Sequence, residues 1–155
     1  MRGGFSLLEL ILVLCIIAIL ATIALPYINS PKQDAILLKL KADLTMIQSG
    51  IAAAKNEQML VNSALNLSVL DEAAVNLVGE RLFYCSKAQI SACNGGSNCC
   101  TTSILNSGIV SNTKGWLKTG VRSYRFYLSA KKFIDFEFNA NESSFECLSL
   151  CKELL

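Results

Sequence analysis

The N-terminal part of the chain is dominated by a run of apolar side chains. From Leu10 to Leu25 every residue except Thr22 is apolar, and Phe5–Leu8 extends the run to about 20 residues. As a helix this run is about 30 Å long, which is enough to cross a lipid bilayer. Glu9 interrupts the run near its beginning. Because proline cannot donate a backbone hydrogen bond, Pro26 predicts a kink where the run ends.

A second helical pattern lies between Lys32 and Leu60, where apolar residues recur at intervals of three and four. Ser30 is a suitable N-cap, and Pro31 is a suitable first helical residue. We expect the two patterns to form one long helix that bends near Pro26. Charged residues, Asp43 among them, fall mostly outside the apolar stripe, which the rest of the chain can cover. The stripe consists of Ile36, Leu40, Leu44, Ile47, Ile51 and Ala54.

The middle of the chain has a weaker pattern. Asp71–Val78 predicts a short helix that ends at Gly79, and Arg81–Cys85 predicts a short strand or a turn. Residues 91–111 are rich in Asn, Gly, Ser and Thr and contain several cysteines. Because this segment is too polar to pack, we expect a loop that is held by disulfide bonds.

The last third alternates between apolar and polar residues, which is typical of strands with one buried face. Ser123–Leu128, Phe133–Phe138 and the segment around Phe145 predict a three-strand antiparallel meander. We therefore expect an α+β protein, in which the long bent N-terminal helix packs on a small antiparallel sheet beside a disulfide-held loop region.

The register of this meander follows from keeping the apolar side chains on one face. The first hairpin then needs a loop with an odd number of residues, Ala130–Lys132, and the second needs an even loop, Ala140–Ser143. The expected pairs are Phe126–Phe136, Leu128–Ile134 and Arg125–Glu137 in the first hairpin, and Phe138–Phe145 and Phe136–Cys147 in the second.

The amino-acid composition excludes several classes of function. The 155 residues include no histidine, which removes Ser–His and Cys–His nucleophile pairs and every His-containing metal site. The net charge of +2 is too small by itself to indicate nucleic acid or an anionic membrane as a partner. We therefore expect no enzyme, and no catalytic, cofactor-binding or metal-binding residues.

Seven cysteines are many for this length. Cys15 lies in the apolar run, and the other six lie in the C-terminal half. An even number behind an export-like N-terminus indicates an oxidised framework in a periplasmic or extracellular domain. A zinc site is the alternative, but the C-x-x-C spacing is absent. The sequence leaves the pairing open, and we expect Cys85–Cys93, with Cys99 or Cys100 reaching Cys147 or Cys151.

Three interpretations of the N-terminus are open. In the first, the apolar run belongs to a cleaved secretory signal with a cleavage site at Thr22–Ala24, although its basic region is a single arginine. In the second it is a plain signal anchor, which gives the carboxylate of Glu9 no role. In the third, Met1–Gly4 is a short leader. Cleavage after Gly4 then frees an amine on Phe5, one helical turn from Glu9, and this amine supplies the opposite charge.

The third interpretation also agrees with a resemblance to a known family. The segment Gly4-Phe5-Ser6-Leu7-Leu8-Glu9, followed by the apolar run and Pro26, resembles the N-terminus of type IV pilins and type II secretion pseudopilins. The resemblance covers roughly residues 1–31. It implies that a prepilin peptidase cleaves between Gly4 and Phe5 and N-methylates Phe5. It also implies that Glu9 meets the Phe5 amine of an adjacent subunit during assembly.

The resemblance implies a filament subunit whose partners are other pilin subunits. Its helix would wait in the bacterial inner membrane as a single pass, with the head in the periplasm, before it joins a periplasmic or cell-surface filament. A membrane-anchored periplasmic binding protein that never polymerises is the alternative. The expected domains are the leader 1–4, the transmembrane and assembly half of the helix 5–27, its amphipathic half 28–60, and a globular head 61–155.

A basic stretch between Lys114 and Lys132 contains six Lys or Arg residues and no acid. Aromatic residues are interleaved with them, as in surfaces that bind DNA. A filament subunit that binds DNA for uptake is therefore a further alternative, although pairing with the acidic residues of 133–155 on a solvated sheet explains the same pattern. The residues that would contact DNA are Lys114, Trp116, Lys118 and Arg122.

Overall fold

A computed structural model describes residues 7–24, 31–61, 67–93 and 98–154. The chain divides into two compact units, Met1–Ile36 and Leu37–Leu155, and each is described by itself. The second unit is called the head below. Its helices, small antiparallel sheets and disulfide bonds make the chain an α+β protein, as the sequence predicts.

The first unit contains helix α1 (Leu7–Ala24) and the first residues of helix α2 (Pro31–Val61). Inside α1 the hydroxyl of Thr22 donates a hydrogen bond to the carbonyl of Ile19 at 2.7 Å. None of the helices that the structure describes is both long and apolar enough to span a membrane. The expected single bent helix is not shown, because α1 and α2 are described as separate helices and Pro26 lies outside the described residues.

Helix α2 begins at Pro31, as its N-terminal signals predict, and packs on the sheet with the predicted stripe. Leu40, Ile47, Ile51 and Ala54 of that stripe are buried. One expectation is wrong: Asp43 lies on the buried face and is only 7% exposed. Its carboxylate accepts a hydrogen bond from an indole, which explains how a charged residue is accommodated there.

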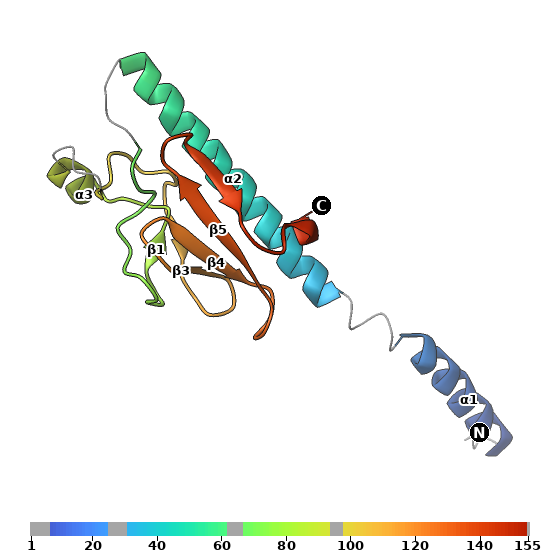
Figure 1. Cartoon of the computed structure of the whole chain (residues 1–155). Coiled ribbons are helices and arrows are strands. Elements are labelled where there is room, and N and C mark those ends of the chain that lie inside the picture. The colour runs from blue at the N-terminus through green and yellow to red at the C-terminus, as the bar shows by residue number, and fades with distance from the viewer. Residues whose placement is uncertain (1–6, 25–30, 62–66, 94–97, 155) are drawn as a thin grey trace, which may run out of the picture. The chain divides into compact units, whose positions relative to one another are not determined.

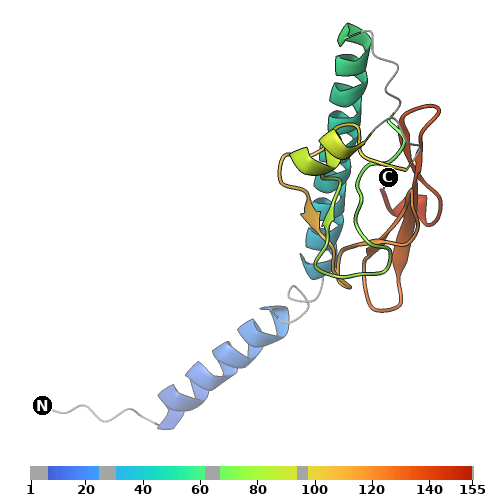
Figure 2. The same cartoon turned by 90° about the vertical axis from the view of Figure 1, so that its left-hand side faces the viewer.

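The main sheet of the head has four antiparallel strands in sequential order, β3-β4-β5-β6 (Figure 1). The expected three-strand meander is confirmed in β4, β5 and β6, and the sequence pattern missed β3. Alternate residues of β4 and β5 are buried, which places one face of the sheet against α2 (Figure 2). The strands are β3 (Trp116–Lys118), β4 (Ser123–Tyr127), β5 (Phe133–Asn139) and β6 (Ser144–Cys147).

The second hairpin has the expected register. The register of the first hairpin is shifted by two residues from the expected one. Phe138 lies opposite Phe145, and Phe136 lies opposite Cys147. In the first hairpin Phe126 pairs with Ile134 instead of Phe136. A shift of two residues keeps the same side chains on the buried face, so the hydrophobic pattern cannot distinguish the two registers.

Hydrogen bonds within the loop select the observed register. The first hairpin closes through a loop from Leu128 to Lys132. In this loop the backbone N–H of Leu128 donates to the carbonyl of Lys132 at 2.9 Å. The backbone N–H of Lys132 also donates to the hydroxyl of Ser129 at 3.2 Å. As a consequence Arg125 lies across from Asp135, and the expected Arg125–Glu137 pair is wrong.

An aromatic cluster fills the space between α2 and the sheet. Phe136 and Phe145 stack with ring centroids 5.5 Å apart, and Trp116 packs against Phe126 at 5.1 Å. Phe83 joins the cluster from outside the sheet, with its centroid 4.6 Å from that of Tyr124. Aromatic pairs in these geometries add to the gain from burial alone, so this cluster is the centre of the hydrophobic core.

The middle of the chain forms short elements around this core. Strand β1 (Arg81–Leu82) pairs with β2 (Ile109–Val110), and helix α3 (Lys87–Ala92) starts with a capping box at Ser86. A 3₁₀-helix spans Cys151–Leu154. The helix expected at Asp71–Val78 is absent from the structure, because the Asp71 side chain binds elsewhere in the core.

The six cysteines of the C-terminal half form three disulfide bonds, which confirms an oxidised framework. The expected pairing is wrong, since Cys85 does not bond Cys93 and no bond joins the loop to the C-terminus. Each cysteine pairs with a partner that the local fold brings near it. The bonds are Cys85–Cys100, Cys93–Cys99 and Cys147–Cys151.

A close contact between α2 and the loop before β2 gives a test of the fold. A Cβ added at Gly50 would lie 2.5 Å from the carbonyl oxygen of Ile104. We expect Gly50→Ala to destabilise the head by about 1–3 kcal/mol, although alanine is the better helix former by about 1 kcal/mol. Thermal unfolding measures the change, with Ser49→Ala as the exposed control. A Gly50→Ala chain that is as stable as the wild type would contradict this packing.

Candidate functional site

Helix α1 exposes apolar side chains on every side. Leu7 and Leu8 are 76% and 75% exposed, and the side chains described from there to Thr22 are all exposed in the isolated chain. Glu9 lies in the first turn of this helix, where the partial positive charge of the helix N-terminus favours a carboxylate. Gly4 and Phe5, the expected processing residues, lie outside the described residues. A helix that is apolar all round is stable only when lipid or other helices cover it.

The basic stretch 114–132 is not a continuous surface. Trp116 and Lys118 are 1% and 4% exposed, because both point into the core from β3. Lys114 is exposed, whereas the Nε–H of Arg122 donates to the carbonyl of Ser68 at 2.8 Å. The four residues expected to contact DNA therefore do not come together at the surface.

Lys118 belongs to a buried ion pair. Its ammonium lies 2.7 Å from Oδ1 of Asp71, whose side chain is fully buried. The same carboxylate accepts hydrogen bonds from the phenol of Tyr124 at 2.9 Å and from the backbone N–H of Phe83 at 2.8 Å. Burial, followed by the charge of Asp71, raises the pKa of Tyr124 well above its usual value. Tyr124 therefore stays a hydrogen-bond donor, and the network links β3, β4 and the segment after α2.

Asp43 and Trp116 form a second buried polar contact. The indole Nε1–H of Trp116 donates to Oδ2 of Asp43 at 3.0 Å. Burial raises the pKa of Asp43, while this hydrogen bond and the charge of Lys39 act in the opposite direction. The contact fixes α2 against the first residue of β3.

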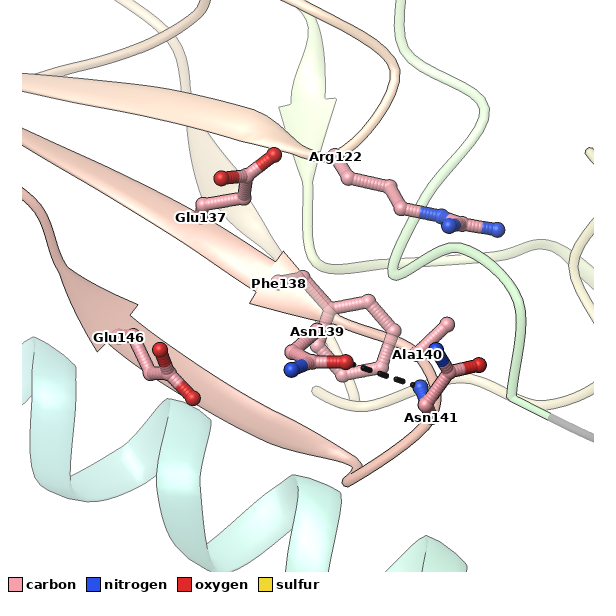
Figure 3. A pocket seen from close by; sticks show the side chains of 7 residues that line it. All are labelled: Arg122, Glu137, Phe138, Asn139, Ala140, Asn141 and Glu146. Carbon is pink, nitrogen blue, oxygen red and sulfur yellow. Dashed lines mark hydrogen bonds between the residues drawn. The ribbon is translucent and has the colours of Figure 1, made fainter.

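The solvent side of the sheet carries charged side chains. Arg125 forms a pair with Asp135 at 2.7 Å, and its guanidinium lies 3.7 Å from the ring centroid of Phe133. Further along the strands a hollow of about 270 Å³ is open to solvent (Figure 3). Glu137 and Glu146, on neighbouring strands, lie directly opposite each other in its wall. The residues that line it are Arg122, Glu137, Phe138, Asn139, Ala140, Asn141 and Glu146.

Among the described residues no three His, Cys, Asp or Glu side chains come together in a way that would hold a metal ion.

Comparisons with family models, with curated proteins and with solved structures found no match for this chain.

Sequence reasoning missed both buried polar contacts. Asp71 and Lys118 are 47 residues apart, and Asp43 and Trp116 are 73 residues apart. The available signal was Lys118, which lies two residues after Trp116 and so on the same side of an extended segment. A charged residue at such a position needs a buried partner, but the sequence does not indicate which carboxylate supplies it.

Two lysines of the same stretch allow a matched test of the buried pair. We expect Lys118→Met to destabilise the chain by about 3–5 kcal/mol, because it leaves the carboxylate of Asp71 buried without its counter-charge. Lys114→Met is the control and should leave stability nearly unchanged, since Lys114 is exposed. Guanidinium unfolding in detergent measures both. A Lys118→Met chain within about 1 kcal/mol of the wild type would contradict the pair.

Proposed function

We propose that this chain is a filament subunit of the type IV pilus or type II secretion pseudopilus kind. The observation that carries the proposal is Glu9, the one acid in the first turn of an otherwise apolar and uncovered helix. The segment Gly4–Glu9 and Pro26 support it through their resemblance to pilin N-termini. A disulfide-held head, in which α2 packs on an antiparallel sheet, agrees with such a subunit.

The proposed work is assembly rather than catalysis. Before assembly the apolar run lies in the inner membrane, where lipid covers its side chains. During assembly, helices of neighbouring subunits replace the lipid, and similar apolar contacts are retained. Transfer of the helix from lipid to the filament is then close to balanced in free energy. A small number of polar contacts can therefore determine how neighbouring helices align.

Glu9 is proposed to supply the decisive polar contact. After a prepilin peptidase cleaves behind Gly4, Phe5 carries a free amine that is then N-methylated. The carboxylate of Glu9 pairs with the Phe5 amine of a neighbouring subunit. In an apolar surrounding two opposite charges attract far more strongly than in water, and leaving either one unpaired is costly.

A membrane-anchored periplasmic protein that never polymerises is the second candidate function. It is favoured by the compact head, whose described core residues are buried by other parts of the same chain. It gives no role to cleavage after Gly4 or to pairing of Glu9. The two candidates therefore differ in what removal of the Glu9 charge does.

The test replaces Glu9 with glutamine in the native host. We expect Glu9→Gln to remain inserted and processed, while its incorporation into filaments falls by about tenfold or more, because a charge pair in an apolar surrounding is lost. Mass spectrometry of the membrane fraction and of sheared filaments measures processing and incorporation separately.

The matched control is Asp34→Asn, which removes an acid from the first turn of α2. It should assemble like the wild type. Equal incorporation of Glu9→Gln and wild type would contradict the pairing, and absence of the wild-type chain from any filament would favour the anchored alternative.

A further inference from the structure

One end of the head carries a group of exposed basic side chains. The loop Leu128–Lys132 between β4 and β5 contributes Lys131 and Lys132, both exposed. The backbone N–H of Tyr127 donates to the carbonyl of Gly115 at 2.9 Å, which places Lys114 beside the same loop. Trp116 follows Gly115 and contacts Asp43 of α2, one helical turn after Lys39, so Lys39 lies toward the same end. The basic end consists of exposed Lys39, Lys114 and Lys131 together with half-buried Lys41.

Two carboxylates near this end have partners within the head. Asp43 is buried and accepts the indole hydrogen bond, and Asp135 is paired with Arg125. The partly exposed rings of Tyr127 and Phe133 flank the loop that carries Lys131, with centroids 6.1 Å apart. This end therefore combines exposed lysines with aromatic rings, which is a combination found where proteins contact the headgroup region of a bilayer.

The opposite end of the head has the opposite charge. The Nζ of Lys55, late in α2, donates to the carbonyl of Glu142 at 3.4 Å, which fixes the β5–β6 loop beside the later part of the helix. Exposed Glu137, Glu142 and Glu146 lie there. Both views show the loop 128–132 at the end of the head where α2 begins and the β5–β6 loop at the end where α2 finishes (Figures 1 and 2). The charges are therefore separated along the head.

The basic end is also the end through which the apolar segment joins the head. The chain passes from α1 into the head through the beginning of α2, immediately before Lys39. Lys32 and Asp34, which precede the head in α2, are of opposite sign and add no net charge. A bilayer that holds the apolar run is therefore connected by a short length of chain to the end of the head with the most positive charge.

We infer that the basic end rests on anionic phospholipid headgroups while the apolar run is in the membrane. The inference rests on the membrane stage of the proposed function, and it does not require assembly. Each lysine at such a surface favours contact by on the order of fivefold at low ionic strength. The contact would hold the head at the membrane until the subunit is extracted, and salt would weaken it.

The test uses the full chain in vesicles of phosphatidylcholine, with and without phosphatidylglycerol. Flotation of the vesicles first shows that the chain is inserted. Amide hydrogen exchange then compares residues 112–115 and 128–132 with residues 72–78 as an internal reference, since these are not contacted by the lysines that the variants replace. We expect exchange at the basic end to slow by at least about fivefold when phosphatidylglycerol is present, and this effect to disappear at high salt.

Two double variants remove equal charge from different places. Lys114→Gln with Lys131→Gln should abolish most of the slowing, and Lys55→Gln with Lys87→Gln, on exposed positions away from this end, should retain it. Both changes leave the buried Lys118–Asp71 pair intact. A loss of slowing in the first variant only is the result that supports the inference.

Several results would overturn it. One is an inserted chain whose exchange is the same in both kinds of vesicle, which leaves the proposed function standing. A second is slowing that depends on the density of protein in the vesicles rather than on phosphatidylglycerol, because this indicates contact with a second copy of the chain. A third is slowing that a DNA oligonucleotide produces in neutral vesicles and phosphatidylglycerol does not. A chain that does not float with the vesicles would instead overturn the membrane stage and this inference together.

Discussion

Helix α1 has no cover of its own in the isolated chain, and this is the constraint that the proposed role must satisfy. The side chains described from Leu7 to Thr22 are exposed, and all but a few are apolar. Apolar surface in contact with water costs roughly 25 cal/mol per Å², so a helix of this kind needs lipid or other helices around it. In either surrounding the carboxylate of Glu9 is a charge among apolar groups, and an opposite charge is what stabilises it.

The core of the head is formed by the head's own side chains. Its aromatic core contains two buried acids, and each has a specific partner: Asp71 binds Lys118 and Tyr124, and Asp43 accepts from Trp116. These contacts join α2 and the segment after it to β3 and β4. They also use Trp116 and Lys118, two of the four side chains that a DNA-binding surface would need.

Local patterns predicted the parts of this structure that local physics determines. The apolar period fixed the buried face of α2, and alternation with an even loop fixed the register of β5 and β6. The first hairpin differs because a shift of two residues preserves its buried face. Strand β3 was missed because a buried lysine interrupts its apolar pattern, and Lys118 finds its partner Asp71 47 residues away. The disulfide pairing was missed because six cysteines allow many pairings, and the fold selects short-range ones such as Cys85–Cys100.

The most direct test of the central claim is the mass of the N-terminal peptide of the protein isolated from its native host. The account predicts a chain that begins at Phe5 with one added methyl group, so that an amine exists for Glu9 to pair with. Gly4→Val is the control, because a β-branched residue at this position should block cleavage and leave Met1–Gly4 attached. A natural chain that retains Met1, or that begins after Ala24, would contradict the account.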